Sequence, residues 1–151
     1  MENNVNISMK KELTEKQIRE LIDRAMAMLQ RSYIPYSHFA VGAALLAKDG
    51  RIFTGCNIEN AAYSPSVCAE RTAFFKAISE GATEFDAIAI VGGKDRHADS
   101  FCPPCGVCRQ VMMEWCRPEE FQIITAVESG AYQIHTLAEY LPDGFGPGNL
   151  A

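Results

Sequence analysis

The sequence predicts an α/β fold, a three-layer α-β-α sandwich built on a mixed five-stranded sheet. Strand and helix patterns alternate along the chain, which is typical of a sheet with helices on both faces. Residues 39–47 and 51–57 have strand patterns and are joined by Lys48-Asp49-Gly50, which indicates an antiparallel hairpin. Residues 85–91 form a nearly continuous apolar run, the pattern of a strand covered on both faces.

The first helix is expected to begin at Thr14 and to end near Arg31. Thr14 and Gln17 have the spacing of a capping box. Behind them, apolar residues recur at helical spacing and form one buried face: Ile18, Leu21, Ile22, Ala25, Met26 and Leu29. Residues 1–13 lack such a pattern, so we expect a flexible N-terminal extension followed by a single domain at residues 14–151.

Helices and strands alternate in the rest of the chain. A helix at residues 68–80 is expected to bury Ala73, Phe74 and Ala77. The later elements are a helix at residues 106–116, strands at 121–127 and 132–135, and a short helix at 137–141. Thr136 is expected to cap that last helix.

The composition restricts the class of partner. The 151 residues carry a net charge of −5 and no basic stripe, so a nucleic-acid binder is not favoured and a small-molecule substrate is expected. The longest apolar run, residues 39–47, is too short for a membrane-spanning helix. The first ten residues lack the apolar segment of a secretory signal. We therefore expect a cytoplasmic protein whose six cysteines are thiols or metal ligands, not disulfides.

Two short motifs carry the candidate chemistry, Cys68-Ala69-Glu70 and Pro104-Cys105-Gly106-Val107-Cys108. Three thiolates can bind Zn²⁺ and leave the fourth position to water. Residues two apart project to opposite sides of a helix, so Cys68 and Glu70 can share a metal only if it lies end-on to the first turn. Cys105 and Cys108 suit the first turn of a second helix. We therefore expect zinc between two helix N-termini, with Glu70 as a proton shuttle and not a ligand.

Other polar residues accompany these motifs. Asn57 and Glu59 follow a strand and project to the same side, although an ordinary loop role explains the spacing equally well. Arg71 follows Glu70 and can draw electron density from the cysteine sulfurs. Phe145 lies in a glycine-rich tail, where an exposed aromatic ring is wasteful unless it docks.

Taken together, the motifs resemble those of the cytidine deaminase family. The matching segments, in order, are residues 37–44, 57–60, 68–71, 104–110 and 141–147. The resemblance covers roughly residues 14–150, almost the whole chain. A cysteine at position 68, where other members have histidine, is similar to the short, homotetrameric, zinc-dependent branch of the family.

The resemblance implies hydrolytic deamination of cytidine and deoxycytidine to uridine and deoxyuridine, with release of ammonia, in pyrimidine salvage. It implies that Cys68, Cys105 and Cys108 hold one Zn²⁺ per subunit and that Glu70 is the catalytic acid and base. Arg71 would then adjust the charge of the ligands.

The resemblance also assigns five residues to the substrate. Asn57 and Glu59 would hold the ribose hydroxyl, Phe39 would pack against the pyrimidine, and the backbone of Ala69 would contact the edge of the base. Phe145 would reach into the pocket of a neighbouring subunit and cover the base there. This last role implies a homotetramer with active sites shared between subunits.

Alternative functions remain open. Cys102, Cys105 and Cys108 form a Cys-x-x-Cys-x-x-Cys pattern, which together with Cys68 could hold a closed structural zinc or an iron–sulfur cluster. Against this, Pro103-Pro104 stiffens the approach to Cys105. A dithiol redox protein could use the Cys105-x-x-Cys108 pair, but it would not need Glu70. Within the deaminase superfamily, the alternative is a deaminase of aminonucleoside antibiotics.

Overall fold

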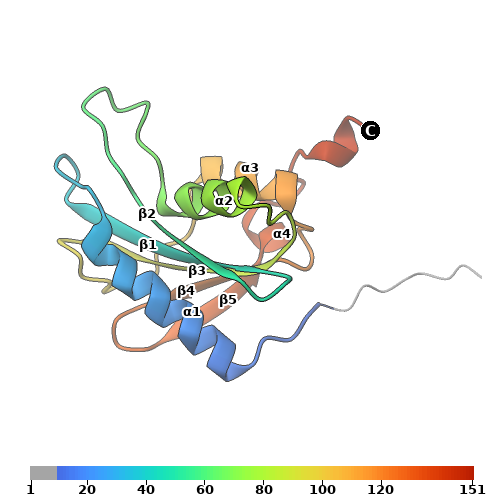
Figure 1. The fold of residues 1–151 in the computed structure, drawn as a ribbon, viewed down its shortest axis with the longest axis horizontal. Coiled ribbons are helices and arrows are strands. Elements are labelled where there is room, and N and C mark those ends of the chain that lie inside the picture. Colours follow the sequence, from blue (N-terminus) through green and yellow to red (C-terminus); the bar gives the residue numbers. More distant parts are fainter. Residues whose placement is uncertain (1–9) are drawn as a thin grey trace, which may run out of the picture.

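The computed structural model describes residues 10–151 and contains a five-stranded sheet in the order β2-β1-β3-β4-β5 (Figure 1). The strands are β1 Phe39–Ala47, β2 Ile52–Cys56, β3 Phe85–Lys94, β4 Gln122–Ala126 and β5 Tyr132–Thr136. β1 is antiparallel to both β2 and β3, β3 and β4 are parallel, and β4 and β5 are antiparallel. The predicted mixed five-stranded sheet is therefore confirmed.

Helices cover both faces of this sheet. They are α1 Glu15–Met28, α2 Ala69–Ser79, α3 Gly106–Trp115 and α4 Leu137–Tyr140, with short 3₁₀ helices at Leu29–Arg31 and Pro147–Asn149. Figure 1 shows α1 on one face and α2 and α3 on the other. β3 serves both layers, since Ile88 and Ile90 join the core under α2 and α3 while Ala89 and Val91 join the core under α1. This alternation explains the continuous apolar run and confirms the three-layer sandwich.

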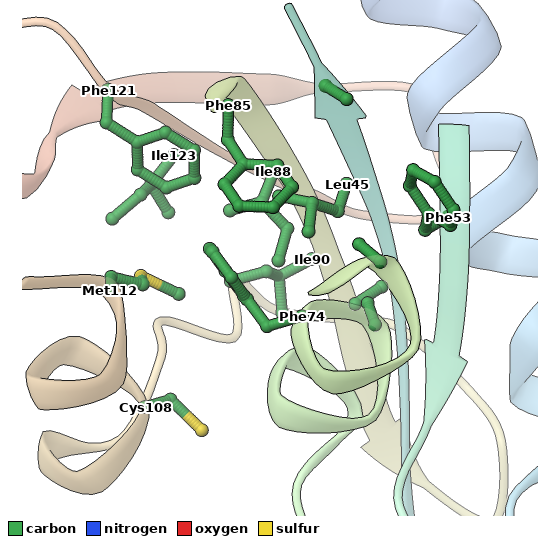
Figure 2. Close-up of a cluster of buried hydrophobic side chains, with 14 of the residues drawn as sticks. Leu45, Phe53, Phe74, Phe85, Ile88, Ile90, Cys108, Met112, Phe121 and Ile123 are labelled. Atoms are coloured by element: carbon green, nitrogen blue, oxygen red, sulfur yellow. The ribbon is translucent and has the colours of Figure 1, made fainter. Parts of the chain in front are cut away.

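An aromatic cluster fixes α2 and α3 on the sheet (Figure 2). Phe74 of α2 is fully buried, and its ring lies 5.0 Å from that of Phe85 and 6.0 Å from that of Phe121. Cys108 and Met112 of α3 belong to the same cluster. Because interiors are close-packed, this contact also fixes where the two helices begin.

The edge strand β2 lies unusually close to the start of α2. A Cβ atom added at Gly55 would lie 2.2 Å from the carbonyl oxygen of Ala69 and 2.6 Å from the backbone nitrogen of Ala73. Thr72 strengthens this contact, because its hydroxyl donates a hydrogen bond to the carbonyl of Cys56 at 3.0 Å. Glycine at position 55 therefore allows the first turn of α2 to sit directly on the sheet.

The predicted capping box forms at Thr14, and Thr136 caps α4 as predicted, in a second capping box with Glu139. The predicted flexible extension is partly outside the described residues, which begin at residue 10. Within it, Leu13 is buried, and Lys11 Nζ lies 2.6 Å from the buried carboxylate of Asp86. Residues 11–13 are therefore held against the sheet, because a buried carboxylate is costly without a cationic partner. In the part of the chain from residue 10 onward, the helices are too short or too polar to cross a lipid bilayer.

Candidate active site

Three cysteine sulfurs meet where α2 and α3 begin. Cys68 is the N-cap of α2, Cys105 is the N-cap of α3, and Cys108 lies in the first turn of α3. Their Sγ atoms all lie within 4.8 Å of one another, and those of Cys68 and Cys105 are 3.7 Å apart. Tetrahedral zinc with Zn–S bonds of about 2.3 Å separates two sulfurs by about 3.8 Å. The three residues therefore fit a zinc ion, between two helix N-termini as the spacing predicts.

The charge around the sulfurs favours a thiolate at Cys68. The neighbouring Cys108 thiol and the Arg71 guanidinium lower the pKa of Cys68 to about 5, and the proximity of Cys68 raises the pKa of Cys108. Arg71 Nη2 donates a further hydrogen bond to Cys68 Sγ at 3.5 Å. The guanidinium therefore lies against a metal ligand, as the resemblance implies, and compensates part of its negative charge.

Glu70 is placed beside the sulfurs but is not one of the clustered ligand atoms. It lies in the first turn of α2, is 4% exposed, and its Oε2 accepts a hydrogen bond from Cys108 Sγ at 3.7 Å. Burial raises the pKa of this carboxyl to about 7. A carboxyl that titrates near neutral pH can both accept and donate protons under physiological conditions.

A pocket of about 420 Å³ opens onto this group. Of the residues expected at the site, it is lined by Asn57, Glu59, Cys68, Glu70, Arg71 and Cys105. Other residues that line it are Val41, Ser66, Val67, Cys102, Pro103 and Val107. Cys108 is buried behind the pocket wall. The structure thus brings the predicted metal, acid and ribose residues together around one cavity.

Three of the predicted substrate residues do not line this pocket. Phe39 is 40% exposed at the start of β1, and Ala69 is fully buried beneath Gly55. Phe145 is 56% exposed, and its backbone carbonyl is bound by Gln110 on α3. Within its own chain, Phe145 is therefore outside the pocket.

The predicted ribose pair is held in place by the start of β1 and by the residues just before it. Asn57 Oδ1 accepts a hydrogen bond from the backbone N–H of Val41 at 2.9 Å, and Asn57 Nδ2 donates one to the carbonyl of Phe39 at 2.8 Å. The carboxylate of Glu59 accepts hydrogen bonds from the N–H of Ser37 at 3.2 Å and from its hydroxyl at 3.1 Å.

The role of Ser37 as a partner of Glu59 is not predicted by the sequence. Its polar side chain just before a strand is a weak signal, and no periodicity pairs it with a residue 22 positions away.

Cys102 does not join the metal cluster. Among the described residues, the group of possible ligands within 4.8 Å of one another comprises Cys68, Cys105 and Cys108. Cys102 lines the pocket and packs against Gly92 at the end of β3, where burial raises its pKa to about 12. The donor set is thus three thiols with an open side, which suits a catalytic and not a closed structural site.

A larger cavity, about 660 Å³, lies elsewhere, at the far end of α3 around Trp115. Its charged residues are largely paired with one another, as in the ion pairs Lys11–Asp86, Lys48–Glu84 and Arg117–Glu120. It contains no cluster of metal-binding groups among residues 10–151. The groups that can bind a metal or transfer a proton are therefore at the smaller pocket.

Three cysteine sulfurs at two helix N-termini, beside a buried glutamate, are the arrangement of the zinc-dependent deaminase class. A family model described as the cytidine and deoxycytidylate deaminase zinc-binding region matches residues 15–125. The chain belongs to this family.

Individual relatives agree with the family match. A cytidine deaminase from Sporosarcina psychrophila is 46% identical over 136 residues, which cover 89% of this chain and 95% of the relative. The crystal structure of cytidine deaminase from Burkholderia pseudomallei superimposes with a TM-score of 0.78 at 41% identity, covering 88% of this chain and 100% of that one. The crystal structure of the Mycobacterium tuberculosis cytidine deaminase gives a TM-score of 0.71 at 38% identity, over 85% and 96% of the two chains.

Proposed function

We propose that this protein catalyses the zinc-dependent hydrolytic deamination of cytidine and deoxycytidine to uridine and deoxyuridine, with release of ammonia, as a step of pyrimidine salvage. The observation that carries the proposal is the buried Glu70 beside three sulfurs whose spacing fits zinc. The similar proteins from Sporosarcina psychrophila and Burkholderia pseudomallei are both cytidine deaminases, which supports the same substrate.

Cys68, Cys105 and Cys108 would hold the zinc, which lowers the pKa of a bound water towards neutrality. Glu70 takes one proton from the water that attacks C4 of the pyrimidine and gives it to N3. It then takes the remaining hydroxyl proton and passes it to the amine, which leaves as ammonia while the C4 carbonyl forms. One carboxyl can do both because the steps are sequential, and a pKa near 7 suits both roles.

The ribose would be held by Asn57 and Glu59. The resemblance assigns Phe39 and the backbone of Ala69 to the base, and because neither lines the pocket in this structure, binding of the base would have to bring them into contact with it. Glu59 lines the pocket and has a carboxylate that Ser37 orients, which leaves acceptor capacity for a sugar hydroxyl. Asn57 has a second amide hydrogen beyond the one given to Phe39. A hydroxyl bound in this way would select nucleosides over free bases.

Replacing the ribose residues is expected to weaken nucleoside use. Glu59→Ala should lower kcat/KM for cytidine by a factor that corresponds to a loss of roughly 1–3 kcal/mol in binding free energy, the cost of leaving a buried hydrogen-bonding group unpaired. Turnover of free cytosine should be unchanged. Asn57→Ala should have a similar kinetic effect but also lower the free energy of unfolding, because it removes two bonds to β1. Steady-state kinetics on cytidine and cytosine, with urea unfolding, measure both effects. A wild-type protein that deaminates both compounds equally well would exclude the ribose role.

The proposed assembly is a homotetramer in which Phe145 covers the base in a neighbour's pocket. Its support is the position of Phe145, exposed and outside the pocket of its own chain. Removing the tail from Gly144 onward should leave a folded, zinc-loaded protein with kcat/KM lowered by roughly 10- to 100-fold, as expected when one aromatic contact is lost.

Mixed oligomers test whether the tail acts between subunits. Tail-less subunits combined with subunits carrying Glu70→Gln should recover activity, because the intact tail of one completes the intact metal site of the other. The measurement is cytidine turnover of hybrids whose assembly is confirmed by native mass spectrometry. Hybrids no more active than the separate variants would show that the tail does not act on a neighbouring site.

The proposed function as a whole is tested by metal analysis together with an absorbance assay for the conversion of cytidine to uridine. Zinc near one ion per chain with rapid turnover is the expected result. Turnover of an aminonucleoside antibiotic with none of cytidine would instead favour the related antibiotic deaminases.

A further inference from the structure

The C-terminal tail is bound to α3 by two neighbouring side chains, Arg109 and Gln110. Arg109 Nη1 donates a hydrogen bond to the carbonyl of Tyr140 at 2.5 Å, and its guanidinium lies 4.9 Å from the centre of the Tyr140 ring. Gln110 Nε2 donates a hydrogen bond to the carbonyl of Phe145 at 2.9 Å. The two hydrogen bonds hold the backbone at Tyr140, where the tail begins, and at Phe145, the residue proposed to cover the base.

Arg109 also reaches the segment that carries the metal ligands. Its Nε donates a hydrogen bond to the carbonyl of Pro104 at 2.7 Å. Pro104 directly precedes Cys105, and Arg109 directly follows Cys108. A planar guanidinium can donate to two carbonyls at once in a fixed geometry, which the single ammonium of lysine cannot reproduce. One side chain therefore connects the ligand loop to the start of the tail.

Close packing against Met113 further restricts the path of the tail. A Cβ atom at Gly144 would lie 3.1 Å from Met113 Sδ, and one at Gly146 would lie 3.1 Å from Met113 Cε. The backbone on each side of Phe145 thus lies against Met113 of α3, while the Phe145 side chain remains exposed. The backbone of this residue is held, and its ring is available to another chain.

We propose that Arg109 and Gln110 are positioning residues that hold the tail at a fixed place relative to the metal ligands, so that each subunit presents Phe145 to its neighbour in a defined position. Neither side chain needs to touch the nucleoside. This inference rests on the proposed function, since the tail can assist deamination only if the protein is a deaminase.

Gln110→Ala is the first test, with Gln110→Glu as the isosteric variant that cannot donate to the Phe145 carbonyl. Both should raise KM for cytidine about tenfold and leave kcat and zinc content close to wild type. Both should also accelerate chymotryptic cleavage after Phe145 at least several-fold, followed by mass spectrometry as the loss of residues 146–151, because a loosened tail opens more often. The matched control is Gln30→Ala, the same chemical change at an exposed position outside the tail contact.

A double-mutant cycle separates positioning from a general effect on α3. In the protein truncated before Gly144 the Phe145 carbonyl is gone, so Gln110→Ala should have no further effect on KM there. If the double variant raised KM by the product of the two separate increases, the truncation and Gln110→Ala would act independently, and the proposal would be overturned.

Arg109→Lys distinguishes the two anchors. It should accelerate the same cleavage and also accelerate loss of zinc to a chelator by about tenfold, because one ammonium cannot hold both Pro104 and Tyr140. Gln110→Ala should change only the cleavage. Arg117→Lys, at an arginine bound to Glu120, is the control.

Cleavage rates in Gln110→Ala and Arg109→Lys equal to those of the two controls would overturn the assignment. The cleavage and chelator experiments need no turnover. They therefore decide the positioning roles even if the wild-type protein fails to deaminate cytidine, a failure that would overturn the proposed function instead.

Discussion

The Glu70→Gln variant is expected to keep its zinc and to lose nearly all cytidine turnover, with kcat lowered by about 10²–10⁴-fold or more. Glutamine has the shape of glutamate, so it fills the same buried space beside the sulfurs. It cannot carry a proton, so N3 and the leaving amine are no longer protonated. Because Glu70 is outside the set of clustered sulfurs, every proposed ligand remains.

The measurements for Glu70→Gln are zinc per chain, the free energy of unfolding and cytidine turnover. Folding should not suffer, because burial already disfavours the charged form of Glu70 and the amide is neutral. Glu80→Gln, at an exposed position at the end of the same helix, is the control. Loss of zinc in proportion to activity would make Glu70 a ligand or a support of the ligands, and would refute its role as proton shuttle.

The second large effect is expected from Cys105→Ser, in contrast to Cys102→Ser. Cys105 caps α3 with its sulfur 3.7 Å from that of Cys68, so its replacement removes a thiolate from the metal. Zinc and turnover should be lost together, because serine is a poor zinc ligand. Cys102 packs against Gly92 and is not among the clustered sulfurs, so Cys102→Ser should keep zinc near one per chain and turnover within a few-fold of wild type.

The two cysteine variants are compared side by side for zinc content and for cytidine turnover. Cys102→Ser is a suitable control for Cys105→Ser, because Cys102 lines the same pocket and lies in the same segment of the chain. If Cys102→Ser lost zinc to the same degree as Cys105→Ser, the site would be a closed four-cysteine site. A fourth thiolate would occupy the position that the nucleophilic water needs, and the proposed deamination would fail with it.

The position of the candidate metal between two helix N-termini could be predicted from local spacing. Cys68 and Glu70 are two apart and Cys105 and Cys108 three apart, and each spacing is compatible with only a few arrangements on a helix. Local patterns also predicted other features: the caps at Thr14 and Thr136, the hairpin and the buried strand β3. Each of these signals depends on residues within about one turn or one strand of each other.

The partners that lie far apart in the sequence were decided only by the tertiary structure. Ser37 contacts Glu59, Lys11 contacts Asp86, and Cys102 packs against Gly92 and lies outside the group of clustered sulfurs. The contact of Gly55 with the first turn of α2 also joins residues far apart in the sequence, since it depends on where the helix packs on the sheet.

The sequence by itself determined which residue types are available for the chemistry and on which local elements they lie. Hydrophobic periodicity and capping are local properties, so they define helices and strands without defining their neighbours. The strand order β2-β1-β3-β4-β5 depends on side-chain packing across the sheet, and so does the placing of α2 and α3 over the Phe74 cluster. That packing brings the two predicted motifs together and leaves Cys102 outside the metal-binding set, because it fixes how the N-termini of both helices lie relative to each other.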